Sequence, residues 1–298
     1  MLHYPKISII TPNFNGEKYL EQTIQSVLSQ NYPNLEYIII DGGSTDNSVE
    51  IIKKYESQLA FWVSESDKGL YDAVQKGFDK STGDIMAWIN SDDLYHPKAF
   101  FTVAEIFKFS EVNWLQGIPS IFDEMGRTVA VSGIKRWSKL DYYLGNFKWI
   151  QQESVFWRRS LWESAGSKLS TEMKYAGDLE LWLRFFRHEK LYVTNALLGG
   201  FRQQPEGQLS SNFIGEYMEE ARAKIEDEVE NNISKEERDI VVSLKACNSL
   251  LSKVRFTILK KILDKFFNAQ ILKKKQLHFS YPPMIYFDRI KQEFKIDQ

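Results

Sequence analysis

Residues 64–93, SESDKGLYDAVQKGFDKSTGDIMAWINSDD, contain the pattern that decides the fold. An apolar run at residues 85–89 has the length of a buried strand and is followed by the carboxylates of Asp92 and Asp93. Such carboxylates face the crevice in which open α/β sheets bind their ligands, and they suit Mg²⁺ or Mn²⁺ that is shared with a phosphate. Adjacent acids after a strand also occur in turns and helix caps, so the neighbouring segments decide between these interpretations.

Two more β-branched runs end in polar loops. Residues 6–11 (KISIIT) are followed by PNFNG, and residues 35–40 (LEYIII) are followed by DGGSTD. Apolar residues recur at helical spacing after each strand, at residues 20–28, 49–55 and 70–78. This alternation predicts an α/β fold with a mostly parallel sheet flanked by helices, in which residues 1–95 form a nucleotide-binding half.

The rest of the chain divides into two parts. Residues 96–215 complete the predicted catalytic domain, 1–215, as an acceptor half rich in aromatic residues. These residues either stack on sugar rings or belong to the core, and they include Trp137, Tyr142, Tyr143, Phe147 and Trp149. Residues 216–298 are expected to form a helical C-terminal extension. It is acidic over residues 216–239 and basic over residues 253–275.

Composition narrows the class of protein. With 298 residues, 43% of them hydrophobic, the chain can bury a substantial core. A formal net charge of −2 argues against nucleic acid as the main partner. The single cysteine, Cys247, fits a reducing cytoplasmic setting. No apolar run approaches the roughly 20 residues that span a bilayer, so we expect a cytoplasmic protein, soluble or peripheral at the inner face of the plasma membrane.

Four motifs, in this order and spacing, carry a resemblance to a known family. They are TPNFNG at residues 11–16, IIIDGGSTDNS at 38–48, DKGLYDAVQKGFDKSTGD at 67–84 and WINSDD at 88–93. Together they closely resemble the family 2 glycosyltransferases of the GT-A fold, over about the first 210 residues. The resemblance implies a Rossmann-like mixed sheet and an inverting transfer of sugar from a nucleotide-sugar.

The resemblance also implies residues that bind the donor. In the family, the first loop and the Asp of the DGGSTD segment contact the nucleoside, which implies that role for Thr11, Pro12, Asn15 and Asp41. Asp67 is implied to lie near the base or the ribose.

Asp92 resembles the metal-binding member of the family signature, whose usual form is Asp-x-Asp. Asn90 takes the first position of the signature here and still offers a carbonyl oxygen, while Asp93 is the adjacent candidate ligand. The implied cofactor is Mn²⁺ or Mg²⁺, which bridges the two phosphates and neutralises charge on the leaving diphosphate. No Gly-rich phosphate-binding loop with a lysine is visible in the sequence.

Asp178 is the predicted general base, because YAGDLELWLR at residues 175–184 resembles the acidic segment that opens a helix in the family. Gly177 replaces the usual preceding acid, Glu180 is the local rival, and a helix cap is the alternative role for Asp178. Gln151 and Gln152 resemble residues that border the acceptor. Arg202 is a possible phosphate contact, in a loop where Gln204 replaces the His of many relatives.

The predicted function is transfer of a sugar from a nucleotide-diphosphate donor, with a UDP-sugar favoured, to a glycan or lipid-linked glycan in surface polysaccharide, lipopolysaccharide or capsule synthesis. Two alternatives remain open. One is a sugar-phosphate nucleotidyltransferase, although the loop that such enzymes use for the triphosphate is not visible. The other is a catalytically silent nucleotide-sugar binder or scaffold, which the departures at Asn90, Gly177 and Gln204 favour.

The basic end of the extension predicts a further partner. Its apolar residues fall on one helical face and its lysines gather on the other, over residues 253–267. Such a helix lies on an anionic membrane, or it packs on the catalytic domain or on a second subunit to form a homo-oligomer.

Overall fold

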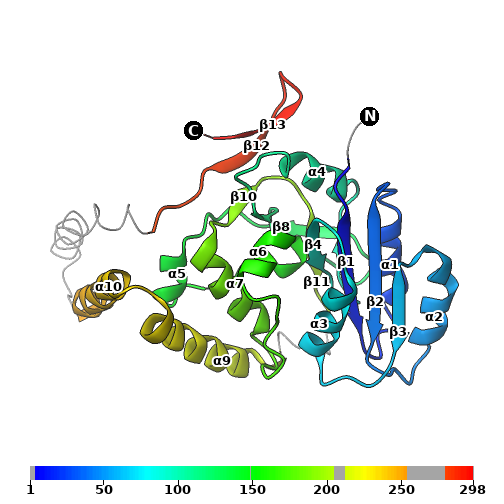
Figure 1. Ribbon diagram of the computed structural model, residues 1–298, viewed down its shortest axis with the longest axis horizontal. Helices are drawn as coiled ribbons and strands as arrows, with labels where there is room; N and C mark the ends of the chain where they lie inside the picture. Colours follow the sequence, from blue (N-terminus) through cyan, green and yellow to red (C-terminus); the bar gives the residue numbers. More distant parts are fainter. Residues whose placement is uncertain (1–3, 148, 205–211, 254–278, 298) are drawn as a thin grey trace.

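The computed structural model describes residues 4–147, 149–204, 212–253 and 279–297. Its centre is a nine-stranded, mostly parallel sheet with the order β13-β12-β10-β6-β9-β4-β1-β2-β3 (Figure 1). The strands are β1 (Ile7–Asn13), β2 (Leu35–Asp41), β3 (Phe61–Ser64), β4 (Ile85–Trp88), β6 (Trp114–Gln116), β9 (Val155–Arg158), β10 (Tyr192–Thr194), β12 (Met284–Asp288) and β13 (Glu293–Ile296). The predicted α/β class and GT-A type of sheet are confirmed.

A smaller sheet has the order β5-β11-β7-β8, and helices cover both faces of the large sheet. Its strands are β5 (Leu94–Tyr95), β7 (Ser120–Phe122), β8 (Thr128–Val131) and β11 (Gly199–Arg202). The helices are α1 (Leu20–Leu28), α2 (Ser48–Tyr55), α3 (Leu70–Lys80), α4 (Ala99–Ile106), α5 (Lys139–Tyr143), α6 (Arg159–Ser164), α7 (Gly177–His188), α9 (Ile214–Asp227) and α10 (Lys235–Lys253). Short turns of 3-10 helix lie at Glu56–Gln58 and Gln152–Ser154, and a π-helix lies at Glu228–Asn232.

The strands β2, β1 and β4 are parallel neighbours in a register that aligns Ile38, Ile10 and Trp88. Every residue of β1 and β4 is buried, because helices cover both faces of the sheet. These strands therefore lack the alternation of apolar and polar residues that a strand with one face in solvent shows. β1 extends two residues beyond the predicted end, so that Pro12 and Asn13 belong to the strand. The carboxyl ends of these strands therefore meet at one edge of the sheet.

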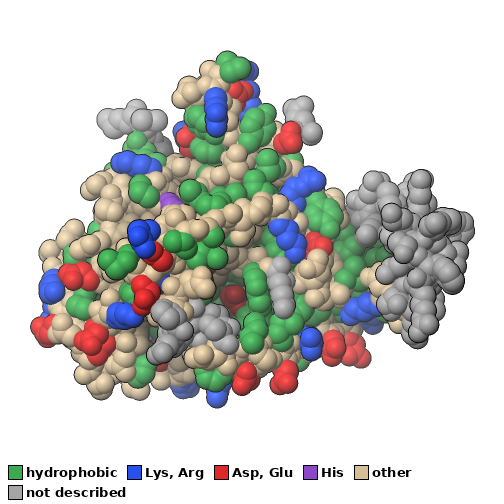
Figure 2. Space-filling view, turned by 180° about the vertical axis from the view of Figure 1, so that it is seen from behind, with side chains coloured by type: hydrophobic (Ala, Val, Ile, Leu, Met, Phe, Trp, Pro, Cys, Tyr) green, Lys and Arg blue, Asp and Glu red, His purple; other side chains and the backbone are tan. Residues whose placement is uncertain are grey.

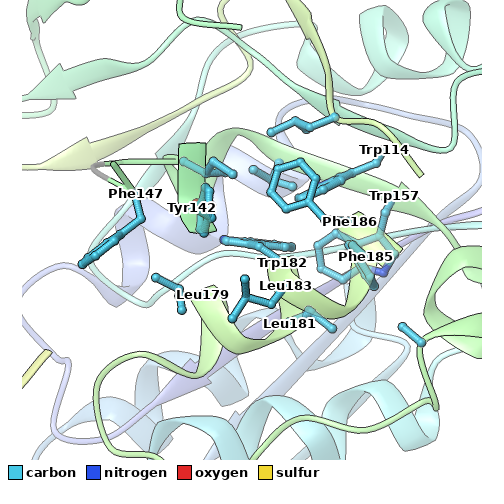
Figure 3. Packing of buried hydrophobic residues seen from close by; sticks show 14 of the residues in the cluster. Trp114, Tyr142, Phe147, Trp157, Leu179, Leu181, Trp182, Leu183, Phe185 and Phe186 are labelled. Carbon is cyan, nitrogen blue, oxygen red and sulfur yellow. The ribbon is translucent and has the colours of Figure 1, made fainter. Parts of the chain in front are cut away.

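The core on the α3 and α7 side of the sheet is dominated by aromatic rings around Trp182 of α7 (Figure 3). The Trp182 ring stacks on Trp88 with centroids 5.9 Å apart and contacts Trp114 and Trp157 at 5.4 and 5.9 Å. Four of the aromatic residues considered for sugar stacking belong to this core, since Trp137, Tyr142, Tyr143 and Phe147 are at most 2% exposed. For these four, the core interpretation is correct.

The C-terminal extension is part of the same folded unit. Ile225 of α9 and Val241 of α10 are buried in the aromatic core. Two ion pairs, Arg187–Glu228 and Lys139–Glu237, join the extension to the catalytic domain. Beyond it, β12 pairs in parallel with β10, and β12 and β13 form an antiparallel hairpin that projects from the body (Figures 1 and 2). The extension was predicted to be helical. Its last residues instead form a β-hairpin that joins the large sheet.

The predicted basic helix lies almost entirely outside the described residues. Within the described part of the chain, no helix has both the length and the apolar composition to cross a membrane.

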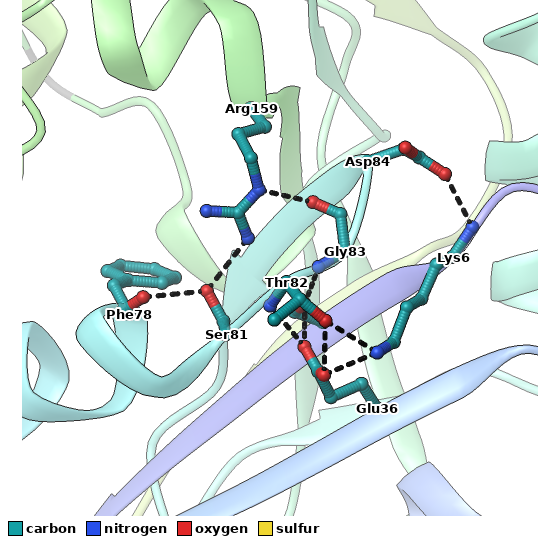
Figure 4. A network of polar contacts seen from close by, with 9 residues as sticks. Lys6, Glu36, Phe78, Ser81, Thr82, Gly83, Asp84 and Arg159 are labelled. Carbon is teal, nitrogen blue, oxygen red and sulfur yellow. Dashed lines mark hydrogen bonds and ion pairs between the residues drawn. The ribbon is translucent and has the colours of Figure 1, made fainter.

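Glu36 anchors a polar network at the amino ends of β1, β2 and β4, opposite the edge described above (Figure 4). Its carboxylate accepts hydrogen bonds from the Ser8 hydroxyl at 2.5 Å and from the Thr82 backbone and hydroxyl at 2.6 and 2.7 Å, and it pairs with Lys6 at 2.6 Å. Burial alone would raise the pKa of Glu36, but these donors outweigh it and lower the pKa to about 2. The network thereby ties the turn between α3 and β4 to both neighbouring strands.

We predict that Glu36→Gln lowers the free energy of unfolding at neutral pH by roughly 1–3 kcal/mol, because charge-assisted bonds to buried donors are lost. A carboxylate with a depressed folded-state pKa stabilises the fold above its unfolded pKa, near 4.5, and loses this effect as the pH falls towards about 2. Urea unfolding of the variant should therefore depend less on pH in that window. Glu50→Gln, at an exposed ion pair with Lys53, is the control and should change stability by less than about 0.5 kcal/mol. Equal effects of the two substitutions would contradict the assignment.

Candidate active site

The loops that follow β1 and β2 are joined through the Asp41 carboxylate. It accepts hydrogen bonds from the Asn13 amide at 2.7 Å, from the Ser44 hydroxyl and backbone at 2.5 and 2.9 Å, and from the Ser64 hydroxyl at 2.6 Å. Burial opposes ionisation, but the four donors outweigh it and lower the pKa of Asp41. Asp41 therefore remains a carboxylate that holds three strand ends together.

The residues predicted to bind the nucleoside lie along these loops at different depths. Thr11, Pro12 and Asp41 are buried, and the Thr11 hydroxyl is 3.0 Å from that of Tyr37. Asn15 is exposed and accepts a hydrogen bond from the Thr45 backbone at 2.8 Å, whereas Asp67 is half-buried. The buried three form the floor of the site and the other two reach its surface. Their contacts with a nucleoside stay predictions.

Close packing brings the Asp67 loop onto the loop that follows Asp41. A Cβ atom on Gly42 would lie 2.6 Å from the Asp67 carboxylate, so only glycine allows this approach. The Asp67 carboxylate also accepts a hydrogen bond from the Gly69 backbone at 2.8 Å, at the start of α3. The side chain is thus held beside Asp41.

Asp93 is turned into the protein. It is 1% exposed, and its two oxygens accept hydrogen bonds from the Arg202 backbone at 2.8 Å and from the Asn90 amide at 3.1 Å. Burial and the charges of Asp92 and Glu153 raise the pKa of Asp93 well above its usual range. Both oxygens of Asp93 are thus engaged by the protein itself, and its role as a metal ligand stays a prediction.

Asp92 and Asn90 are the members of the signature that keep oxygen atoms available. One oxygen of Asp92 accepts a hydrogen bond from the Gln204 amide at 2.6 Å, and burial raises the pKa of Asp92. The carbonyl oxygen of Asn90 is buried and has no hydrogen-bond partner, although such groups are normally paired. Carboxylate and carbonyl oxygens fit Mg²⁺ or Mn²⁺. Among the described residues, no group of three or more His, Cys, Asp or Glu side chains could hold a metal by itself.

Arg202 positions the Asp92–Asp93 turn from behind. Its side chain is 0% exposed and donates to the backbone oxygens of Asp92 at 2.6 Å and Glu124 at 2.8 Å, while its guanidinium lies 4.6 Å from the centre of the Tyr19 ring. The buried guanidinium thus bonds to backbone carbonyls, and the predicted phosphate contact of Arg202 stays a prediction.

Asp178 lies at the start of α7 with one carboxylate oxygen buried and without a partner. Burial raises its pKa to about 6, against the opposing effect of the backbone N–H groups at the helix start and of the Tyr71 hydroxyl. The rival, Glu180, is bound through both oxygens to Arg184 at 2.8 Å. Asp178 is thus the carboxylate of this segment that is free to accept a proton.

Two contacts hold the start of α7 in place. The Glu220 carboxylate of α9 accepts hydrogen bonds from the backbone N–H groups of Lys174, Tyr175 and Ala176 at 3.1, 2.9 and 3.0 Å. The Tyr71 ring presses on residue 177, where a Cβ atom would lie 2.7 Å from it. This packing explains why Gly177 replaces the acid that the family resemblance leads one to expect.

Sequence reasoning missed Glu153, a buried acid in the 3-10 turn that precedes the apolar start of β9. Burial, together with the charges of Asp92 and Asp178, raises the pKa of Glu153 to about 7. The neighbouring Gln151 and Gln152 instead bond to backbone groups, Ser120 at 2.8 Å and Trp88 at 2.6 Å. Their amide nitrogens therefore bond to the fold itself, and the predicted acceptor contacts stay predictions.

Figure 2 shows hydrophobic side chains bordering a hollow near the middle of the face that it draws, with acidic atoms visible inside the hollow.

The geometry defines an α/β protein with an acidic, oxygen-lined site at the carboxyl edge of its parallel strands. Residues 8–162 match the family model "Glycosyl transferase family 2". The chain belongs to this family.

Three comparisons show the range of its relatives. An uncharacterized glycosyltransferase of Nostoc sp. is 32% identical over 127 residues, 42% of this chain and 39% of the relative. The putative teichuronic acid biosynthesis glycosyltransferase TuaG of Bacillus subtilis is 36% identical over 92 residues, 30% of this chain and 36% of the relative. Both matches thus span less than two-fifths of the relative's length. The crystal structure of S. aureus TarS 1-349 in complex with UDP-GlcNAc has the same fold, with a TM-score of 0.64 and 20% identity over 84% of this chain and 76% of that one.

We predict that Glu220→Ala lowers the pKa of Asp178 from about 6 towards its ordinary value, because a loosened helix start admits water to a carboxyl group whose pKa is raised by burial. The loss of an acceptor for three backbone N–H groups should also cost roughly 1–3 kcal/mol of stability. Titration of ¹³C-labelled aspartate by NMR measures the pKa. Glu219→Ala, an exposed neighbour on α9, is the control and should change neither quantity. An unchanged Asp178 titration in the Glu220 variant would contradict the positioning role.

Proposed function

We propose that the chain transfers a sugar from a nucleoside-diphosphate donor, with a UDP-sugar favoured, to a hydroxyl group of a glycan or lipid-linked glycan in surface polysaccharide synthesis. The observation that supports the proposal is the pair of buried oxygens without a hydrogen-bond partner, the side-chain carbonyl of Asn90 after β4 and one carboxylate oxygen of Asp178 at the start of α7. The similarity to TuaG and to a TarS fold solved with UDP-GlcNAc and with UDP supports this donor class and this pathway type.

The donor would lie over the carboxyl ends of β2, β1 and β4. Asn15 and Asp67 offer polar groups to the nucleoside at the surface of the first loops. Asp92 and the unpaired carbonyl of Asn90 would hold Mn²⁺ or Mg²⁺. When bound, such an ion would neutralise charge on the leaving diphosphate.

Asp178 would act as the general base. Its unpaired oxygen accepts the proton of the acceptor hydroxyl as the acceptor oxygen attacks the anomeric carbon from the face opposite the diphosphate, which inverts the configuration. A pKa of about 6 lets Asp178 be ionised at neutral pH and yet basic enough to take a proton. Family membership and the carboxylate oxygen of Asp178 that has no partner favour a glycosyltransferase over a nucleotidyltransferase or a catalytically silent binder.

We predict that Asp92→Ala abolishes the Mn²⁺-dependent part of the thermal stabilisation by UDP. A ligand that binds only the folded state at 100 times its Kd contributes about 2.7 kcal/mol, so the loss is measurable as a shift in Tm. UDP with EDTA defines the metal-independent part. Asp79→Ala, on the exposed side of α3, is the control and should keep the full stabilisation. If Asp92→Ala responds to UDP and Mn²⁺ like the unmodified protein, Asp92 does not hold the ion.

We predict that Asp178→Asn keeps the affinity for UDP and Mn²⁺ but lowers kcat by roughly a hundredfold or more. In the unmodified protein kcat/KM should rise with pH through about 6, because Asp178 must lose its proton to act as a base. This limb should vanish in the variant, while Glu180→Gln should keep it. A limb that persists in Asp178→Asn would move the role of base to Glu153, whose pKa is about 7.

A further inference from the structure

Trp149 is an exception among the tryptophans. It is 45% exposed, whereas six of the other seven are at most 3% exposed and Trp62 is half-buried. An indole is a large apolar surface that proteins normally bury, or use to contact a ligand. The position of this ring relative to the proposed base decides between these uses.

Trp149 contacts an aromatic residue of the C-terminal extension. The Trp149 ring contacts Tyr217 of α9 in a T-shaped arrangement, with centroids 5.1 Å apart and planes at 69°. Burial, together with the nearby charge of Asp178, raises the pKa of Tyr217 well above its usual value. Tyr217 therefore contacts Trp149 and also feels the charge of the proposed base.

The other side of Trp149 borders a small cavity at the carboxyl ends of β6 and β10. The cavity has a volume of about 20 Å³, room for about one water molecule or one hydroxyl group, and Gln116 and Thr194 line it. Gln116 is 2% exposed, and its amide nitrogen is buried without a hydrogen-bond partner. A buried donor of this kind calls for an acceptor that the protein itself does not supply.

The sheet order places this cavity beside the donor region. β6 and β10 are two and three strands away from β4, and all three run in the same direction. With strands about 4.8 Å apart, the cavity lies ~10–15 Å along the edge from the strand that precedes Asp92. Donor and cavity thus lie on opposite sides of the Glu153 position.

We propose that Trp149 is the stacking platform for a pyranose ring of the acceptor, and that a hydroxyl group of this sugar enters the cavity and accepts a hydrogen bond from Gln116. The indole plane matches the C–H face of a pyranose, and the buried amide of Gln116, which has no hydrogen-bond partner, supplies a donor in a cavity of hydroxyl size that Thr194 and Lys135 also line. The inference rests on the proposed function, because it assigns the acceptor to the side of Asp178 that faces away from the donor.

The test uses tryptophan fluorescence, which Trp149 dominates in collisional quenching because it is the exposed indole. The probes are methyl glycosides of glucose, galactose, mannose and their N-acetylamino forms. We expect at least one of them to lower the acrylamide quenching constant of the full chain by roughly twofold or more. Trp149→Phe should abolish this protection, and Trp62→Phe should keep it. The absence of protection by every glycoside would overturn the inference.

Transfer kinetics with the protective glycoside as acceptor give the second readout. Trp149→Ala should raise the acceptor KM by roughly tenfold, the range of ring-stacking contacts, and Trp149→Phe should restore most of it. Gln116→Met should raise KM for the protective sugar but not for its analogue that lacks the bonded hydroxyl. Stabilisation by UDP and Mn²⁺ and the slow hydrolysis of donor without acceptor should be unchanged in all three variants. Unchanged acceptor KM in Trp149→Ala overturns this inference alone, whereas absent donor binding and hydrolysis in the unmodified protein overturn the proposed function as well.

Discussion

The burial of four carboxyl groups at one edge of the sheet is the constraint on which the site depends. Burial raises the pKa of Asp92, Asp93, Glu153 and Asp178 above the ordinary range, and the charges of neighbouring carboxylates add to this effect at Asp93 and Glu153. Asp41, a short distance along the same edge, escapes this by accepting four hydrogen bonds. Two kinds of carboxyl group therefore lie along this edge. Asp41 stays ionised and holds the loops together, whereas the groups with raised pKa values can take up a proton or bind a cation.

The C-terminal extension contributes to this edge, although it lies outside the segment that matches the family. Glu220 accepts hydrogen bonds from the backbone that precedes Asp178, and Tyr217 contacts the Trp149 ring. Glu228 and Glu237 in turn anchor the extension through Arg187 and Lys139. A relative that shares only the first half of the chain has no reason to share these supports, so acceptor recognition is free to differ within the family.

The sequence was sufficient where a role follows from local pattern. The ends of β1, β2 and β4 lie at one edge because the strands are parallel, and the order of the motifs already implied this for Asn15, Asp41 and Asp92. The local pattern carries no information where a distant segment decides. Arg202 is buried because its guanidinium bonds to the backbone of Asp92 and Glu124, and Asp93 accepts a hydrogen bond from the Arg202 backbone. The return of β12 to pair with β10, across 89 intervening residues, has no local signal either.

The three departures from the family pattern acquire physical reasons from their neighbours. At position 177 the Tyr71 ring leaves no room for a side chain, which explains the glycine. Gln204 donates a hydrogen bond to one carboxylate oxygen of Asp92. Asn90 adds no further negative charge to an edge where Asp92, Asp93 and Glu153 already repel one another, yet it keeps a carbonyl oxygen without a partner. Gly177 and Asn90 remove a negative charge, while Asn90 and Gln204 keep a polar side chain at the site. Departures of this kind are compatible with catalysis, because the residues that would carry the proton and the ion, Asp178 and Asp92, are the ones that the surrounding packing preserves.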